Sequence, residues 1–289
     1  MNWEALRGNE DTDVINYTRE DRMIGGVNVA TSQIANIYNQ GNNQLSDTLA
    51  KIASGKKFQN AGEDLISFSR ANTLKNQISG YNDVEQKLTA AKTVTSAAVN
   101  VGSKVYENLT KMGDLATKYA TADAQEKAEY AAEFKSLRDT VVTSLENAKV
   151  DGVDIADGSY NKDVAMDPNG GTLAVDLSVA GNFVTSGNIS TLELSDDTAA
   201  AAAATAVGLE TTAALNYMNT AKGYDNTIEN QISLNKTIVN SKEAVKSLIT
   251  DIDEASEMSK MLDQNVRQQA AMSMLSQANM SRQVVMKLY

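Results

Sequence analysis

The longest regular pattern in the chain lies in residues 74–112, which read LKNQISGYNDVEQKLTAAKTVTSAAVNVGSKVYENLTKM. Apolar or small side chains recur at every third or fourth position of this segment. That spacing places them on one face of an α-helix, and its persistence over about five heptads is typical of a coiled-coil-like helix. We therefore expect one long helix over residues 64–120.

The same spacing recurs in residues 28–53, in residues 134–148 and from residue 198 towards the C-terminus. The last segment opens with an uninterrupted Ala run, the strongest local helix former. We expect the helices of the two chain ends to pack together through Ile34, Leu45, Leu49, Ile52, Leu262, Val266 and Met274. We expect the core of the helices between them to contain Leu74, Ile78, Leu88, Val105, Leu109, Ile228 and Ile232.

The middle of the chain, residues 151–197, is different because it holds most of the turn-forming sequences. Within it, residues 173–179 alternate between apolar and small or polar side chains with a period of two, which predicts a half-buried strand. We interpret this region as a small β-hairpin region between two helical arms.

These patterns predict a mainly α fold, in which the terminal helices form a long antiparallel coiled coil and the small β-hairpin region lies at its far tip. Residues 1–22 are polar, show no clear period and are interpreted as an arm.

Composition excludes several functions. The 289 residues include no Cys and no His, which removes thiol chemistry, Cys/His metal sites and His-based acid–base catalysis. A formal net charge of −11 argues against nucleic acid or an anionic membrane as the main partner. The chain has no apolar run of about 18 residues, and its first residues do not resemble a Sec-type signal peptide. We expect no enzyme, no cofactor and no metal.

Short motifs at both ends resemble bacterial flagellin. Residues 52–67, IASGKKFQNAGEDLIS, are similar to the N-terminal signature of that family through Gly55, Asn60, Ala61 and the acidic pair Glu63-Asp64. Gln59 and Ser67 depart from the signature. The resemblance covers about residues 23–289, so residues 1–22 are an extension that the usual member lacks.

The C-terminal motifs are closer to the family pattern. Residues 249–257, ITDIDEASE, match its Ile-x-Asp-x-Asp-x-Ala-x-Glu run, and QQA at 268–270 precedes LSQAN at 275–279. Residues 151–160, DGVDIADGSY, resemble the turn that precedes the hairpin in the family. Each motif alone is weak evidence for the resemblance, but the order and spacing of the motifs together are specific to the family.

The resemblance implies a structural subunit that polymerises into the extracellular bacterial flagellar filament for motility. It implies an inner coiled coil of the terminal helices in the inner tube, plus a helical rod domain with a small β-hairpin region. The predicted segments are then an N-terminal extension (1–22), the two halves of the inner coiled coil (23–60 and 251–289), the rod helices (61–150 and 198–250) and the central region (151–197). The packing residues of the chain ends belong to the inner coiled coil, and those of the helices between them to the rod core. It implies export by the flagellar type III route. It also implies contacts with further copies, either alone or mixed with other flagellins, and with an export chaperone, the filament cap and hook-junction proteins. The short centre implies a flagellin without large outer domains. Innate immune receptors recognise a rod-helix segment that corresponds here to residues 110–115. Lys111, Asp114 and Leu115 fit that segment, but Gly113 replaces an Arg, so we expect weak or no signalling.

Alternatives remain open from the sequence. One is the hook–filament junction protein of the flagellin-like group, which usually lacks the LSQAN ending. Another is an unrelated helical secreted adaptor, or a hydrolase carried on a flagellin scaffold, although the His-Glu-x-x-His metalloprotease version is excluded because there is no His. Asp251 and Asp253 suit packing or capping better than catalysis. Asp151, Asp154 and Asp157 lack the spacing of a calcium loop and are interpreted as turn acids.

Overall fold

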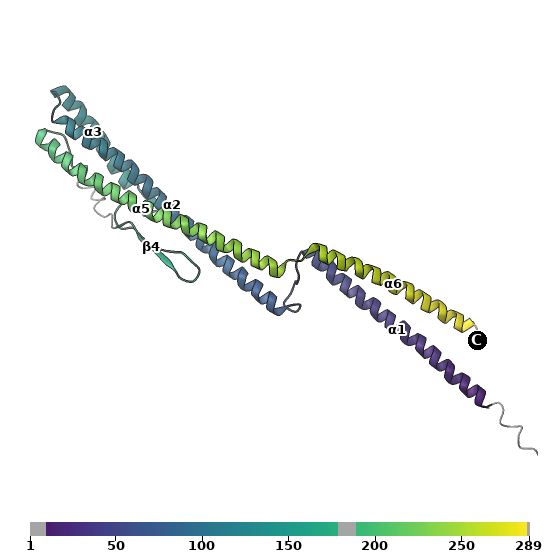
Figure 1. Cartoon of the computed structure of the whole chain (residues 1–289). Coiled ribbons are helices and arrows are strands. Elements are labelled where there is room, and N and C mark those ends of the chain that lie inside the picture. The colour runs from purple at the N-terminus through teal and green to yellow at the C-terminus, as the bar shows by residue number, and fades with distance from the viewer. Residues whose placement is uncertain (1–9, 179–188, 288–289) are drawn as a thin grey trace, which may run out of the picture. The chain divides into compact units, whose positions relative to one another are not determined.

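The computed structural model describes residues 10–178 and 189–287 (Figure 1). The described elements are, in chain order, α1 Glu10–Ser54, α2 Leu65–Tyr119, α3 Ala124–Glu146, β1 Lys149–Val150, β2 Val153–Asp154, β3 Asn161–Ala165, β4 Thr172–Asp176, α5 Asp197–Thr250 and α6 Glu254–Lys287. The predicted mainly α fold with a small β region is therefore confirmed. The expected helix over residues 64–120 corresponds to α2, within one residue at either end.

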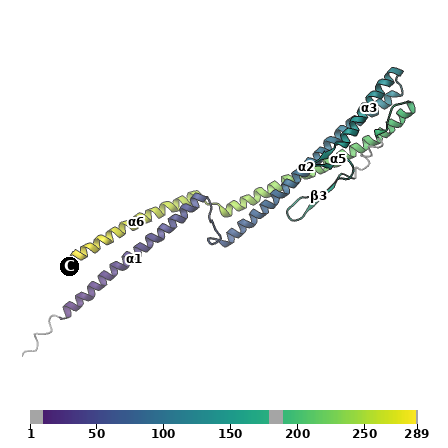
Figure 2. The ribbon, with the colours of Figure 1, turned by 180° about the vertical axis from the view of Figure 1, so that it is seen from behind.

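The chain divides into two compact units, of which one contains Met1–Ala71 and Lys246–Tyr289 and the other Asn72–Val245. In the first unit, α1 and α6 lie side by side and run antiparallel, as Figures 1 and 2 both show. In the second, α2 and α5 lie side by side with α3 beside them and the β3–β4 hairpin along their flank. The boundaries of the six predicted segments fall at other residues than the boundaries of these two units. The six segments remain a prediction.

Four helices begin at an aspartate. The carboxylate of Asp123 accepts hydrogen bonds from the backbone N–H groups of Gln125 and Glu126, and Glu126 completes a capping box. The carboxylates of Asp64, Asp196 and Asp253 likewise accept from the first turns of α2, α5 and α6. An acidic N-cap satisfies N–H groups that have no partner within the helix and complements the helix dipole. These residues fix where the long helices start.

The second unit holds one continuous apolar core. Leu88, Val105, Leu109 and Ile228 of the predicted rod core are fully buried in it, on α2 and α5. Ile232 is half-buried against this core. The other two predicted members lie nearer the start of α2, where Ile78 is buried and Leu74 is half-buried.

Two β-hairpins follow α3. The first joins β1 to β2 through Asp151 and Gly152, which both have positive φ, as a tight two-residue hairpin turn requires. The second pairs β3 with β4 in antiparallel register, so that Val164 lies opposite Leu173. The core receives Val164 and Val175 from this hairpin, which fixes it to the helices.

Two expectations differ from the structure in extent. The strand predicted over residues 173–179 ends at Asp176, because the carboxylate of Asp176 accepts hydrogen bonds from the backbone N–H and hydroxyl of Ser178 and turns the chain; residue 179 lies outside the described residues. The predicted arm over residues 1–22 is helical from Glu10 onward. Apolar periodicity shows which face of a helix is buried, but a helix can form without it. It requires only residues with adequate helix propensity, and residues 10–22 contain no Pro or Gly. Residues 1–9 lie outside the described residues.

Candidate subunit interface

Helices α1 and α6 contact each other along one face of each helix, here called the seam. Its side chains are buried or half-buried and succeed one another at steps of three and four, as in a coiled coil. On α1 the seam comprises Ile34, Tyr38, Gly41, Leu45, Thr48 and Ile52. On α6 it comprises Glu257, Met261, Gln264, Gln268, Ala271, Leu275 and Ala278.

The seam is unusually polar for a coiled coil. The Thr48 hydroxyl donates to the carbonyl of Gln44 at 2.9 Å, and the Gln268 side-chain amide donates to the side-chain oxygen of Asn42 at 3.5 Å. Gly41 lies against this glutamine, and a Cβ there would be in ordinary van der Waals contact with Cγ of Gln268, at 3.7 Å. Since apolar burial is the main driving force of such packing, a polar seam gains less from pairing than an aliphatic one would.

The sequence prediction identified only part of this seam. Ile34, Leu45 and Ile52 lie in it and are half-buried. The remaining predicted members of the inner coiled coil do not lie in the seam and are about half exposed, namely Leu49, Leu262, Val266 and Met274. Met261, Ala271 and Leu275, which do form the seam, were missed because α6 carries two apolar stripes and the more regular one was chosen.

The second stripe faces away from α1. At 3.6 residues per turn, its members fall within an arc of about 80°, on the side of α6 opposite the seam. This outer stripe comprises Met258, Leu262, Val266, Met280 and Val284, whose exposed fractions lie between 49% and 64%. Met274, at 49%, lies outside this arc, about 80° further round the helix than Val266. Apolar side chains gathered on one exposed face mark an interaction surface more often than scattered ones do.

The two motifs from opposite ends of the sequence meet where α1 and α5 end. Gly55 has φ of +68°, which ends α1 in the left-handed conformation that glycine adopts readily. The Ile252 N–H donates to the Gly55 carbonyl at 3.1 Å, and the Lys57 N–H donates to the Thr250 carbonyl at 2.7 Å. The chain therefore joins the ends of α1 and α5 by main-chain hydrogen bonds.

Side chains reinforce this junction. The Lys56 ammonium lies 2.5 Å from Oδ1 of Asp251. The hydroxyls of Ser247 and Thr250 donate to the same carboxylate at 2.5 and 2.8 Å. The hydrogen bond from Lys56, followed by those from Ser247 and Thr250, holds the pKa of Asp251 well below its usual range. Asp253 caps α6, so the two acids have separate roles in the junction, as packing and capping predict.

The predicted receptor segment lies on α2. Lys111 and Asp114 are exposed, whereas Leu115 is buried in the core of the second unit. A Cβ at Gly113 would lie 3.6 Å from the side chain of Val207, so the glycine packs against α5. Of the three residues, only Lys111 and Asp114 have side chains that are accessible to a binding partner when the chain is folded.

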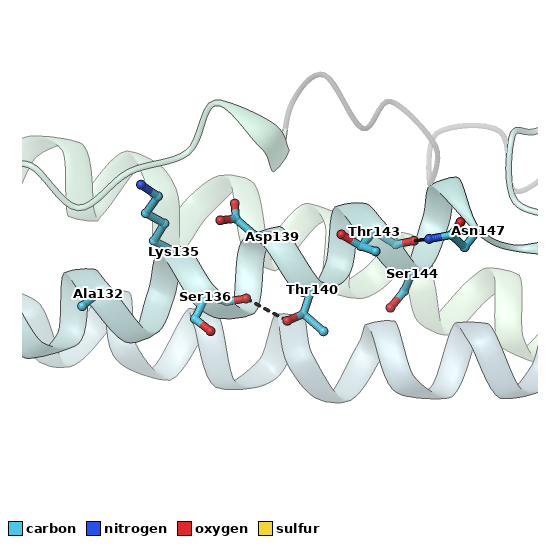
Figure 3. Close-up of a pocket in the computed structure, with 8 residues that line it drawn as sticks. All are labelled: Ala132, Lys135, Ser136, Asp139, Thr140, Thr143, Ser144 and Asn147. Atoms are coloured by element: carbon cyan, nitrogen blue, oxygen red, sulfur yellow. Dashed lines mark hydrogen bonds between the residues drawn. The ribbon is translucent and has the colours of Figure 1, made fainter.

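A shallow groove runs along α3 (Figure 3). Lys135 and Asp139 point to one side of the helix there, and Ser136 and Thr140 point to the other. The Thr140 hydroxyl already donates to the Ser136 carbonyl at 2.8 Å. The groove therefore has no charged groups that converge on a common point, and its chemistry does not suggest a reaction.

The acids of the β1–β2 region act within their own turns. Asp154 accepts from the N–H groups of Ala156 and Asp157, and Asp157 accepts from Ser159. The hydrogen bonds from Ser159 lower the pKa of Asp157. Within residues 10–178 and 189–287, no group of three or more acidic side chains is placed to hold a metal ion, and no helix is apolar enough over sufficient length to cross a membrane.

Comparison of the sequence with known families gives a match in each half of the chain. The bacterial flagellin N-terminal helical region matches residues 27–161, and the bacterial flagellin C-terminal helical region matches residues 210–289. The chain belongs to the bacterial flagellin family. The two matches include the seam and the junction of this flagellin, and residues 162–209, which contain the β4 strand and the start of α5, lie outside both.

Curated relatives are flagellins of Caulobacter vibrioides. FljO is 28% identical over 177 residues, FljM 27% over 177 residues and FljK 29% over 181 residues. Each alignment covers 61% of this flagellin and 64% of the relative. The chain thus spans less than two thirds of the length of the relatives that it matches.

Proposed function

We propose that the chain is a structural subunit that polymerises into the bacterial flagellar filament outside the cell and serves motility. The observation that carries this proposal is the outer stripe of α6, an apolar face that α1 does not cover. A contact between the outer stripe of one copy and a different surface of the next is heterologous, and such contacts generate helical filaments when they do not close into a ring.

The energetics support self-association. Removing a half-exposed Leu, Val or Met from water contributes about 1 kcal/mol per side chain. The five side chains of the outer stripe therefore offer several such contributions in one contact, before the entropy of association is subtracted. The polar seam, by contrast, stabilises α1 and α6 only modestly within one chain. Leu49, Leu262, Val266 and Met274 stay predicted members of the inner coiled coil, and we propose that neighbouring copies cover them in the filament.

The remaining expectations form part of the same proposal. Segments 23–60 and 251–289 would line the inner tube, and segments 61–150 and 198–250 would form the rod around it. The flagellar type III route would export the chain, with an export chaperone, the filament cap and hook-junction proteins as partners. The absence of Cys supports passage through a narrow channel, because no disulfide can form on the way.

Weak innate-receptor signalling is proposed on the basis of α2. The burial of Leu115 and the glycine at position 113 leave Lys111 and Asp114 as the exposed part of the segment. A cell reporter assay that compares this chain with a strongly stimulating flagellin at equal concentration tests it. Full-strength activation would contradict this part of the proposal.

Assembly itself is tested by sedimentation and negative-stain electron microscopy of the purified chain under polymerising conditions. We expect long filaments from the unmodified chain and none from the double variant Leu262→Glu with Val266→Glu. The matched control, Leu262→Met with Val266→Ile, keeps the outer stripe apolar and should polymerise. Filaments of normal length from the charged variant, whose α6 must still be helical by circular dichroism, would sink the proposal.

A hook–filament junction protein is a separate outcome. Such a protein would be present in few copies at the base of native filaments, whereas a filament subunit is their bulk component. Quantitative mass spectrometry of purified native filaments distinguishes the two. A trace amount of this chain beside an abundant second flagellin would favour the junction role.

A further inference from the structure

The loop between β3 and β4 contains the one Asn-Gly pair of the sequence, Asn169-Gly170. We propose that this pair is a site of spontaneous deamidation, at which Asn169 converts to a mixture of aspartate and isoaspartate. The proposal does not depend on filament assembly. It rests on the exposure of the pair, on the backbone of Gly170 and on the contacts that hold the rest of the loop.

The reaction needs the backbone nitrogen of residue 170 to reach Cγ of Asn169. After that nitrogen loses its proton to solvent base, it forms a bond to Cγ, the Cγ–Nδ2 bond breaks, and ammonia leaves with a proton taken from water. The product is a five-membered succinimide. Water then opens the ring at Cγ to give aspartate, or at the main-chain carbonyl carbon to give isoaspartate, so the net change is uptake of water and release of ammonia.

The local structure favours each step. Asn169 and Gly170 are both exposed, so water and base reach them directly. Gly170 has φ of +102°, and a Cβ built on it would meet nothing within 4 Å, so no side chain or neighbour obstructs the attack. The Asn169 N–H donates to the carboxylate of Asp167 at 2.6 Å, whereas the structure shows no hydrogen bond that occupies the Gly170 N–H among the described residues.

Asparagines in the helices differ in this respect. Asn230 of α5 is also exposed, but it is followed by Gln231, and both lie inside a continuous helix. A helical backbone N–H is hydrogen-bonded to a carbonyl of the preceding turn, and helical dihedrals keep it away from the neighbouring side chain. Asn230 is therefore a matched internal control for exposure.

Isoaspartate would disturb a loop that contacts both α2 and α5 just before Asn169. The carbonyl of Met166 accepts hydrogen bonds from Gln231 at 3.0 Å and from Asn235 at 3.1 Å. Pro168 packs on Gly80 of α2, where a Cβ would lie only 3.2 Å from the proline ring. Isoaspartate moves Cβ into the main chain and lengthens it, so these contacts cannot all persist. Either product also adds one negative charge at the exposed loop.

The test is incubation of the purified full-length chain at mildly alkaline pH, followed by peptide mapping. We expect the peptide with residue 169 to gain the mass of replacing NH by O, and to accept methyl groups from an isoaspartyl methyltransferase. The Asn230 peptide should stay unchanged. The variant Asn169→Gln should lose the signal, because a six-membered imide forms far more slowly. Equal modification of residues 169 and 230, or none at residue 169, would overturn the proposal.

Discussion

The ammonium of Lys56 lies 2.5 Å from a carboxylate oxygen of Asp251, although 195 positions separate the two residues in the sequence. The pair stands between two main-chain hydrogen bonds, one from Ile252 to Gly55 and one from Lys57 to Thr250. The ion pair and the two main-chain hydrogen bonds together hold the end of α1 against the end of α5. The flagellin motifs at the two chain ends are therefore halves of one structural unit.

Replacing Asp251 by Asn should loosen this junction without unfolding the chain. The side chains of Lys56 and Asp251 are 48% and 40% exposed, so solvent screens the pair and its loss costs under about 1 kcal/mol. Hydrogen exchange of the Ile252 and Lys57 amides should become faster, whereas amides in the core of the second unit keep their protection. Unchanged protection of both junction amides would mean that the main chain alone holds them.

The junction should also respond to acid. Because the pKa of Asp251 lies below its usual range in the folded chain, its contribution is complete above the unfolded value of about 4 and is lost as pH falls through the folded value. Protection factors of the Ile252 amide, corrected for intrinsic exchange, should decline below about pH 4. The Asp251→Asn variant serves as the control, and its protection should vary less over the same range.

Tyr217→Phe should destabilise the second unit. The buried Tyr217 hydroxyl donates to the carbonyl of Ile155 at 2.6 Å, and burial raises the pKa of this phenol. Removing the hydroxyl leaves a buried acceptor without this donor, which costs about 1–3 kcal/mol. Urea denaturation measures the change, and Tyr224→Phe, a half-buried position on the same helix, is the control. A larger loss at Tyr224 would contradict the assignment.

Core packing is tested by two leucines in the second unit. Leu109 is fully buried on α2, and Leu209 of α5 is 70% exposed. Leu109→Ala should cost about 2–5 kcal/mol because it removes buried methyl groups and leaves a cavity. Leu209→Ala should change the free energy of unfolding by less than about 0.5 kcal/mol. Similar losses in the two variants would show that the core lies elsewhere.

Regular apolar spacing made most helices predictable. Residues 74–112 repeat their apolar pattern so steadily that the ends of α2 could be predicted to within one residue. The turn sequences predicted a β-hairpin region in the centre of the chain. The start of α1 could not be predicted in this way, because residues 10–22 form a helix that has no apolar stripe. The end of β4 depends on a side chain that turns the backbone at Asp176, which alternation cannot detect.

The seam was harder to predict for a physical reason. Periodicity identifies every apolar face of a helix but does not say which face its own chain covers. On α6, Leu262 and Val266 form the more hydrophobic stripe and stay exposed, whereas Gln264 and Gln268 face α1. The ion pair between Lys56 and Asp251 could not be predicted from the sequence either, because the two residues are close only once the chain is folded.

The bridge between Gly55 and Ile252 uses only peptide groups, and so does the bond between Lys57 and Thr250. Peptide groups are the same whatever side chain stands on them, provided that position 55 can adopt a positive φ. The Lys56–Asp251 pair and the amide of Gln59, which donates to the Ala50 carbonyl at 3.1 Å, are side-chain contacts added to this main-chain joint. A substitution at one of those side chains removes one contact, whereas a residue that cannot adopt the conformation of Gly55 removes the shape of the joint itself.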